Sequence, residues 1–320
     1  MAEFNDKIPL IAVVGPTASG KTGLGVALAK AWAGEVVSAD SMQIYKGMDI
    51  ATATPSLEER DNIPHHLMGF LGPEESYNAA DYARMAHSAI GDIHRRGRLP
   101  ILVGGTGLYV SSLLENVDFG AFSVDQGRRR QLENEVAVDG GESLLELLKG
   151  YDPQLAARLH PHDHPRIIRG ILVYEATGKP LSWHKAQSKR IPSPYDACII
   201  GLNYINRDEL YERINLRVEQ MVDQGLVEEA RNCRPRLSQT AAAAIGHKEL
   251  YPYLDGVVPL REAVDKLKRE TRRYAKRQLT WFRRMPGIHW IYLDEVEDAG
   301  RLAAQASAIV KDYFGGERDV

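Results

Sequence analysis

Eight consecutive residues decide the fold of this chain: Gly15-Pro16-Thr17-Ala18-Ser19-Gly20-Lys21-Thr22. They match the phosphate-loop pattern G-x-x-x-x-G-K-[ST] without a gap. An apolar, β-branched run over 8–14 precedes them and predicts a strand, and a run rich in Ala and Leu over 23–32 follows them and predicts a helix. Strand, glycine-rich turn and helix in this order are the context that the pattern requires. The stretch therefore predicts an α/β domain with a phosphate site after its first strand.

The chemistry of this loop indicates a ligand with a diphosphate or triphosphate group. Glycine lets successive backbone N–H groups curl around an anion, and the helix N-terminus adds its positive dipole end. Lys21 supplies a charge for phosphate oxygens, and the Thr22 hydroxyl can bind Mg²⁺. We predict that residues 15–22 bind the phosphates and that Mg²⁺ is the cofactor, with Thr22 as its protein ligand. An ordinary turn with glycine at its bends is the local alternative.

Length and composition limit the class of protein. With 320 residues, of which 44% are hydrophobic and 26% charged, the chain is typical of a globular protein with one large domain or two smaller ones. No apolar run is long enough to span a membrane, and the acidic start over 1–7 is not a secretory signal. Cys198 and Cys233 lack metal or redox spacing, so we expect core thiols. The expected protein is cytoplasmic and monomeric.

Charge is distributed unevenly along the chain. The net charge is −3, but residues 261–284 hold ten Lys or Arg against three acids. Tyr274, Trp281 and Phe282 are interleaved with these basic residues. Basic and aromatic side chains on one helix suit an RNA backbone and stacked bases. They equally suit long side chains that lie over a core stripe, so both interpretations stay open here.

Polar residues follow two further predicted strands. A short strand over 35–39 ends at Asp40-Ser41-Met42-Gln43, and a buried strand over 100–103 runs into Gly104-Gly105-Thr106-Gly107. In an open α/β sheet the carboxyl ends of the strands carry the ligand site, so we expect Asp40 and Thr106 near the phosphate loop. An Asx turn at Asp40 and a tight strand–helix connection at Thr106 are the local alternatives.

The strand pattern disappears between 119 and 192. Helices are predicted at 126–138, 142–149, 153–159 and 165–176, separated by Gly, Asp-Pro and His-Pro breaks. The predicted fold class is α/β: a P-loop NTPase-like core with a mostly parallel sheet flanked by helices, plus an inserted all-helical domain. The core would comprise 1–118 and 193–320, and the helical domain 119–192.

The remaining elements complete the core. We predict a helix at 78–96 with Asn78 or Ser76 as its cap, a strand at 195–202, helices at 208–225 and 262–284, a last strand at 289–293 and a closing helix at 299–313. Arg213 and Arg217 lie four residues apart, away from the apolar face of their helix, where exposed arginines are the local alternative. The pair His65-His66 has no third ligand nearby, so polar packing is favoured over a metal site.

Eight runs of sequence, spread over nearly the whole chain, match one known family in order. They are GPTASGKT (15–22), SADSMQIYKGMDI (38–50), IPHHL (63–67), LPILVGGTGLY (99–109), RIIR (166–169), VYEATGKPLS (173–182), AIGHKEL (244–250) and TRRYAKRQLTWFR (271–283). On these runs the chain resembles the tRNA dimethylallyltransferases, also called tRNA isopentenyltransferases. It departs from many members at Ala51, Thr54, Ala243 and His247, in place of Gly, Lys, Gln and Tyr. These departures concern only fine contacts with RNA or the prenyl chain.

The resemblance implies a transferase that acts on tRNA. A dimethylallyl group would leave dimethylallyl diphosphate and join the exocyclic N6 amine of the adenine immediately 3′ of the anticodon. Asp40 would be the general base, and Thr106 and Arg217 would act with the phosphate loop on the departing diphosphate. The helical insertion would grip the anticodon stem-loop. The implied tRNA-binding residues are Asp40, Ser41, Met42, Gln43, Thr106, Arg128, Lys248, Arg272, Arg273, Lys276, Arg277, Gln278 and Arg283.

Three alternatives are weighed against this interpretation. A P-loop small-molecule kinase would use the same loop for ATP and would carry a Walker-B Asp at the end of a strand. The strand over 101–103 ends in glycines instead, which counts against a kinase. An adenylate isopentenyltransferase, acting on AMP or ATP, would not need the helical insertion. A non-enzymatic RNA-binding module would keep the fold without the chemistry of Asp40.

Overall fold

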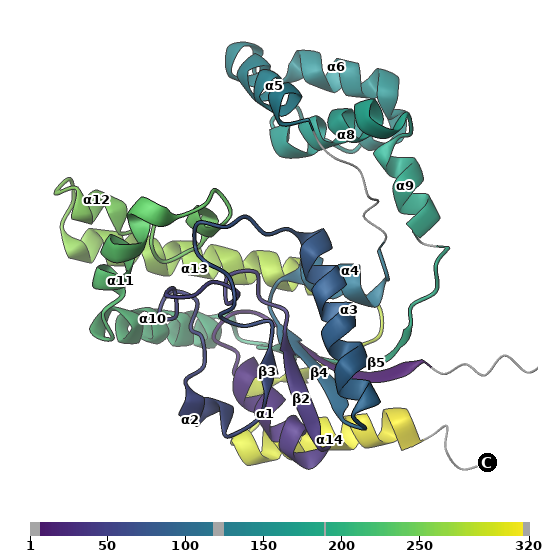
Figure 1. Cartoon of the computed structure of the whole chain (residues 1–320). Helices are drawn as coiled ribbons and strands as arrows, with labels where there is room; N and C mark the ends of the chain where they lie inside the picture. Colours follow the sequence, from purple (N-terminus) through teal and green to yellow (C-terminus); the bar gives the residue numbers. More distant parts are fainter. Residues whose placement is uncertain (1–6, 118–124, 189, 316–320) are drawn as a thin grey trace, which may run out of the picture. The chain divides into compact units, whose positions relative to one another are not determined.

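The computed structural model describes residues 7–117, 125–188 and 190–315 (Figure 1). The chain divides into two compact units, of which the first comprises Met1–Leu114 with Pro194–Val320 and the second Glu115–Ser193. We call the first unit the core and the second the helical unit. The predicted boundary between 118 and 119 lies outside the described residues, as does most of the start over 1–7.

The core is built on a parallel sheet, as the sequence predicted. In the described residues it has the strand order β3-β2-β4-β1-β5-β6, and every pair of neighbouring strands is parallel. The strands are β1 (Ile8–Val14), β2 (Gly34–Ser38), β3 (His65–His66), β4 (Leu99–Gly104), β5 (Tyr195–Asn203) and β6 (Ile288–Tyr292). Because parallel strands end at the same edge, the residues after β1, β2 and β4 meet there.

Helices cover both faces of the sheet, which explains why β1 is apolar throughout. Leu10, Ala12 and Val14 face a cluster that includes α3 (Ala79–Arg95) and α4 (Gly107–Leu114). Ile11 and Val13 face the opposite cluster with α1 (Lys21–Ala31) and α14 (Ala299–Gly315) (Figure 1). Asn78 caps α3, as predicted, because its side chain accepts hydrogen bonds from Ala80 N and Asp81 N.

The rest of the core is a group of helices beside the sheet. The longest are α10 (Arg207–Asp223) and α13 (Leu260–Phe282), which the sequence predicted. The sequence did not predict α2 (Leu57–Arg60), α11 (Leu226–Cys233) or α12 (Tyr251–Leu254). Gly225 separates α10 from α11 and has φ +102, a conformation that favours glycine. Short 3₁₀ turns lie at Arg234–Arg236, Ala241–Ala243 and Leu293–Glu295.

The helical unit has a small core of its own. Its helices are α5 (Gln126–Asp139), α6 (Glu142–Tyr151), α7 (Pro153–Ala156), α8 (His164–Thr177) and α9 (Leu181–Ser188), of which the last was not predicted. Leu132, Leu148 and Ile171 are among the residues that α5, α6 and α8 bury against one another. Asp152 is fully buried and accepts hydrogen bonds from Leu155 N and Ser182 N, so it ties α7 to α9.

A buried carboxylate on β2 accounts for part of the His65-His66 pair. The Glu35 side chain is 6% exposed and is bonded by Arg96 and by His66 Nε2, the latter at 2.7 Å. His65 Nδ1 bonds to Ile63 O at 2.8 Å. The hydrogen bond from Arg96, followed by that from His66, lowers the pKa of Glu35 to about 2 against the opposing effect of burial. Both histidines therefore have protein partners.

Replacing Glu35 should destabilise the core in a pH-dependent way. We expect Glu35→Gln to lower the free energy of unfolding at pH 7 by about 2 kcal/mol, because the half-exposed Arg96 limits the loss. Since folding lowers the Glu35 pKa from 4.5 to about 2, its contribution is complete above 4.5 and is lost as the pH falls toward 2. Urea denaturation at pH 7 and pH 3 should thus give a smaller difference at pH 3. Asp92→Asn is the control, because Asp92 is the exposed carboxylate partner of Arg96. If wild type and Glu35→Gln differed in free energy of unfolding by the same amount at pH 7 and at pH 3, the expectation would be contradicted.

Candidate active site

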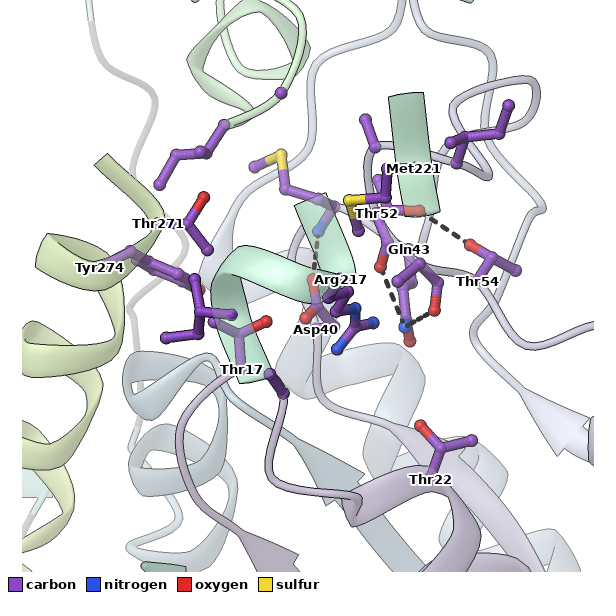
Figure 2. A pocket seen from close by; sticks show the side chains of 18 of the residues that line it. Thr17, Thr22, Asp40, Gln43, Thr52, Thr54, Arg217, Met221, Thr271 and Tyr274 are labelled. Atoms are coloured by element: carbon purple, nitrogen blue, oxygen red, sulfur yellow. Dashed lines mark hydrogen bonds between the residues drawn. The ribbon is translucent and has the colours of Figure 1, made fainter. Parts of the chain in front are cut away.

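One cavity of about 990 Å³ collects most of the predicted site residues of the core. It lies at the carboxyl ends of β1, β2 and β4 and is also lined by α10, α13 and two segments over 49–56 and 243–248 (Figure 2). The predicted residues that line it are Thr17, Ala18, Ser19, Gly20, Lys21, Thr22, Asp40, Ser41, Met42, Gln43, Arg217, Lys248, Arg277 and Gln278. Gly15, Pro16 and Thr106 are not among its lining residues.

The glycines of the phosphate loop adopt backbone conformations that a tight, anion-binding turn requires. Gly15 has φ +151 and packs so closely on β5 that a Cβ there would lie 2.7 Å from Leu202 O. Gly20, with φ +78, precedes α1 without a side-chain cap, which leaves the first N–H groups of the helix available to a ligand. Pro16 O accepts hydrogen bonds from Ser19 Oγ at 2.8 Å and from Lys21 Nζ at 2.5 Å.

The electrostatics of the cavity favour an anion. Burial, followed by the nearby Arg217, lowers the pKa of Lys21 to about 7 against the opposing effect of Asp40. Burial also lowers the pKa of Arg217, opposed by Asp40 and then by Glu59. Figure 2 shows the Arg217 side chain beside Asp40. Asp40 is the carboxylate that acts on both of these withdrawn cations, and a ligand with more than one negative charge would add to this compensation.

Asp40 serves the local turn with one oxygen only. Its Oδ1 accepts a hydrogen bond from Met42 N at 2.9 Å, which forms the Asx turn that was the local alternative. Its Oδ2 accepts no hydrogen bond from any of the described residues. The turn and a chemical role are therefore compatible, because they use different oxygens.

Thr106 holds the turn that carries Asp40. Its backbone N donates to Ala39 O at 3.1 Å, and its Oγ1 accepts from Ser41 N at 2.9 Å and donates to Ser41 Oγ at 3.2 Å. In this arrangement the hydroxyl is bonded to Ser41, and Thr106 does not line the cavity. The structure thus brings Thr106 close to Asp40, as the positions of the strand ends predicted. Thr106 is bonded directly to the turn that carries Asp40.

Family models and curated relatives agree on the family of this chain. The model described as IPP transferase matches residues 43–285, and the one described as isopentenyl transferase matches residues 8–64. A tRNA dimethylallyltransferase of Geobacillus kaustophilus is 48% identical over 308 residues, covering 95% of this chain and 96% of the relative. That of Halalkalibacterium halodurans is 47% identical over 293 residues, covering 91% and 93%. The chain belongs to the tRNA dimethylallyltransferase family.

Solved structures in this family share the fold. The full-length tRNA isopentenylpyrophosphate transferase from Bacillus halodurans matches with a TM-score of 0.71 at 43% identity, over 97% of this chain and 99% of that one. A eukaryotic dimethylallyltransferase acting on tRNA matches with a TM-score of 0.81 at 28% identity, over 97% of this chain and 80% of the other. The predicted α/β fold class, with its parallel sheet and flanking helices, is thereby confirmed.

Gln278 occupies a position that the family resemblance did not suggest. Its side chain is 5% exposed, and its Oε1 accepts from Thr17 N at 2.8 Å while its Nε2 donates to Gly105 O at 3.0 Å. A Cβ at Gly105 would lie 2.2 Å from this amide nitrogen, so glycine is required for the approach. Gln278 thus joins the phosphate loop to the second glycine turn, and its contact with RNA stays a prediction. Its place on the buried face of α13, between Ala275 and Phe282, was the available signal.

The basic residues of α13 divide into bound and exposed groups. Arg272 donates to Asn215 Oδ1 at 2.6 Å, and Arg273 pairs with Glu270 at 2.7 Å. Lys276, Arg277 and Arg283 are exposed, and the Arg277 guanidinium lies 5.7 Å from the centre of the Tyr274 ring at the cavity. Some basic residues of this helix therefore have partners within the core and others face outward, and the contact with RNA stays a prediction.

Four further residues that are expected to contact RNA have partners within their own units. Lys248 Nζ donates to Ala243 O at 2.9 Å beside the cavity. In the helical unit, Arg128 forms a bidentate pair with Glu175, in which Nη2 donates to Oε1 at 3.0 Å and Nε donates to Oε2 at 3.1 Å. Ser41 is bonded to Thr106, and the Gln43 amide is bonded to Ser38 Oγ, Thr52 O and Ala53 O. RNA would have to exchange these bonds for its own.

Tyr274 is a cavity residue whose individual role the sequence did not single out. It faces Asp40 from α13, whereas Gln43 lies on the other side of Asp40 (Figure 2). Burial raises the pKa of the Tyr274 hydroxyl, and the Asp40 charge raises it further. The phenol therefore stays protonated as a hydrogen-bond donor beside the carboxylate.

The residues at the loop fit a Mg²⁺ ion that is bound mainly through its ligand. Mg²⁺ commonly takes one or two protein oxygens and completes its shell with phosphate oxygens and water. The Thr22 hydroxyl lines the cavity at the start of α1 and can supply one such oxygen. Within the described ranges no group of three or more His, Cys, Asp or Glu is arranged to hold a metal. Nor is any described helix long and apolar enough to cross a membrane.

Diphosphate binding should take up a proton at Lys21 above pH 7. An anion favours the charged form of Lys21, so affinity should be insensitive to this group below its pKa of about 7. Above it, affinity should fall by up to about tenfold per pH unit. Calorimetry at pH 8 in two buffers of different ionisation enthalpy should show greater proton uptake for the wild type than for Lys21→Met. Equal uptake by the two proteins would contradict the assignment, since protons bound by diphosphate itself cancel in the comparison.

Proposed function

We propose that this chain transfers a dimethylallyl group from dimethylallyl diphosphate to the N6 amine of the adenine immediately 3′ of the anticodon in tRNA. Diphosphate would be released. The observation that carries this proposal is the shared cavity, in which a cationic phosphate nest and the free Oδ2 of Asp40 face one another. The family of the chain supports it, because relatives over nearly the full length are named tRNA dimethylallyltransferases.

The donor would bind with its diphosphate in the nest of residues 15–22. Lys21 and Arg217 would then stabilise the charge that develops on the diphosphate as it departs. The Thr22 hydroxyl would hold Mg²⁺, which supplies further positive charge to the diphosphate when it is bound. These groups would lower the barrier because they are in place before the reaction begins.

The alkyl transfer would form one bond and break another. The lone pair of the adenine N6 would attack C1 of the dimethylallyl group, and the bond from C1 to the bridging diphosphate oxygen would break. The N6 proton would pass to Oδ2 of Asp40. An aromatic amine holds its proton too tightly to lose it first, so proton removal would accompany bond formation. Thr106 would position Asp40 through Ser41.

Access to the amine requires the adenine to leave the stack of the anticodon loop. Ser41, Met42 and Gln43 line the cavity beside Asp40 and would contact the extruded base. The exposed Lys276, Arg277 and Arg283 of α13 would contact the RNA backbone. Within the helical unit, Arg128 would contact the stem-loop. A mononucleotide does not need the helical unit, which favours tRNA over AMP as the acceptor.

The first test compares possible substrates directly. We expect an anticodon stem-loop, incubated with dimethylallyl diphosphate, Mg²⁺ and the protein, to gain the mass of one dimethylallyl group on its adenine. Mass spectrometry would detect this product, with AMP as the rival acceptor and ATP as the rival donor. Alkylated AMP without alkylated RNA would favour an adenylate isopentenyltransferase. ATP consumption without prenyl transfer would instead favour a kinase, and either result would overturn the proposal.

The second test removes the proposed base. Asp40→Asn keeps the oxygen that accepts from Met42 N, so the turn should persist. It cannot take up the N6 proton, so we expect the turnover number to fall by about 10²-fold or more. Binding of the stem-loop, measured by fluorescence anisotropy, should be retained. Unchanged turnover would remove Asp40 from the mechanism, and loss of RNA binding together with turnover would point to a structural role.

A further inference from the structure

The cavity has an apolar wall opposite in character to its phosphate nest. Six residues both line the cavity and belong to one apolar cluster of the core: Ile50, Ala51, Val218, Met221, Ile245 and Leu267. The diphosphate must lie at the nest, so the organic group of a donor is left to face this wall. Burial of apolar carbon against such a wall is favourable, and its shape limits how many carbons fit.

A carboxylate outside the cavity fastens two parts of this wall. Glu229 of α11 accepts hydrogen bonds from Ile50 N at 2.7 Å and from Ala51 N at 2.9 Å. The same side chain is bonded to His247 Nε2 at 2.8 Å. Glu229 is only 10% exposed, so these charge-assisted hydrogen bonds form away from water. One side chain thus joins the segments 49–54 and 243–248.

His247, at which this chain departs from many members of the family, serves this junction. Its side chain is 1% exposed, and its Nδ1 has no hydrogen-bond partner in the described part of the chain. We therefore assign the ring proton to Nε2, which donates to Glu229. Beside it, Gly246 packs on Ala51, where a Cβ on Gly246 would lie 2.9 Å from Ala51 Cβ. The two wall segments are in direct contact.

The segment with Ile50 and Ala51 is also held from the side of Asp40. Gln43 Nε2 donates to Ala53 O at 3.3 Å and to Thr52 O at 3.4 Å. In addition, Cys233 of α11 donates to Gly47 O at 3.1 Å. The wall segment is therefore fixed between the Asp40 turn and α11, and Glu229 makes its strongest link to α11 because it is the charged acceptor.

We propose that Glu229 is a positioning residue that sets the donor specificity of the site. By holding Ile50, Ala51 and His247 together, it keeps the apolar wall at a spacing that suits a five-carbon allylic group and disfavours a ten-carbon one. This inference rests on the proposed function, since it assumes an allylic diphosphate as donor. Glu229 touches neither the nest nor Asp40, so its effect should be confined to the organic group.

The substitution Glu229→Gln tests this role with little change of shape. One side of the glutamine amide is a donor, so it would face a backbone N–H or the His247 N–H without forming a bond. Glu228→Gln is the matched control, because Glu228 is the preceding residue of α11 and pairs only with the exposed Arg231 among the described residues.

The measurement is calorimetric binding of three unreactive ligands: inorganic diphosphate, dimethylallyl S-thiolodiphosphate and geranyl S-thiolodiphosphate. We expect the wild type to prefer the dimethylallyl compound over each of the others by about tenfold or more. In Glu229→Gln both preferences should fall by about fivefold or more, with diphosphate affinity unchanged, because the wall alone is loosened. Glu228→Gln should match the wild type.

Several results would overturn the inference. A folded Glu229→Gln protein with wild-type preferences would exclude a role in specificity, and an equal loss of affinity for all three ligands would indicate general loosening. If Glu229→Gln does not fold, His247→Leu is the second variant, because it keeps both backbone bonds to Glu229. It should lower both ligand preferences by about twofold. Unchanged preferences in His247→Leu would also overturn the inference. A wild type that shows these preferences yet alkylates no RNA would contradict the proposed function and leave this inference standing.

Discussion

Two cationic side chains withdrawn from water are the constraint on which this site depends. Lys21 and Arg217 face one cavity, and Asp40 is the carboxylate that acts on both. Burying unbalanced charge is costly, so the site is most stable with a multiply charged anion in the nest. The fold makes this placement possible because β1, β2 and β4 are parallel and end at one edge. Gln278 then fixes the phosphate loop against the neighbouring glycine turn.

The chemistry follows from what else faces that anion. A cavity with a cationic nest, a carboxylate with one free oxygen and an apolar wall suits a donor that has both a diphosphate and a hydrocarbon part. In such a donor the nest would hold the leaving group, and the reacting carbon would lie beyond it. The same loop that serves phosphoryl transfer in other proteins would here stabilise the diphosphate as it leaves.

The sequence predicted those parts of the fold that local pattern determines. The strand β1, the phosphate loop and the helices α3, α10 and α13 have strong periodicity or a specific motif, and each lies where it was expected. The two-residue strand β3 was missed because its pairing with β2 depends on a partner and not on its own pattern. The helix α11 was missed because Gly225 marks the end of α10 in the sequence pattern, and the pattern gave no sign that a second helix begins directly after it.

The site was predictable only where residues follow strand ends. Asp40 and Thr106 were placed near the loop on that basis, and they lie there. The supports of the site were not predictable, because they join distant residues: Gln278 bonds to Thr17 across 261 positions, and Glu229 bonds to Ile50 across 179. For neither residue does a sequence motif indicate which distant residue it bonds to.

The central claim is that bond cleavage occurs at carbon and not at phosphorus. It is tested most directly with dimethylallyl diphosphate that carries ¹⁸O at the bridging oxygen between C1 and phosphorus, incubated with an anticodon stem-loop. If the nest holds a leaving diphosphate, mass spectrometry will find the label in the released diphosphate. Label retained on the organic product would show cleavage of the bond to phosphorus and would contradict the claim.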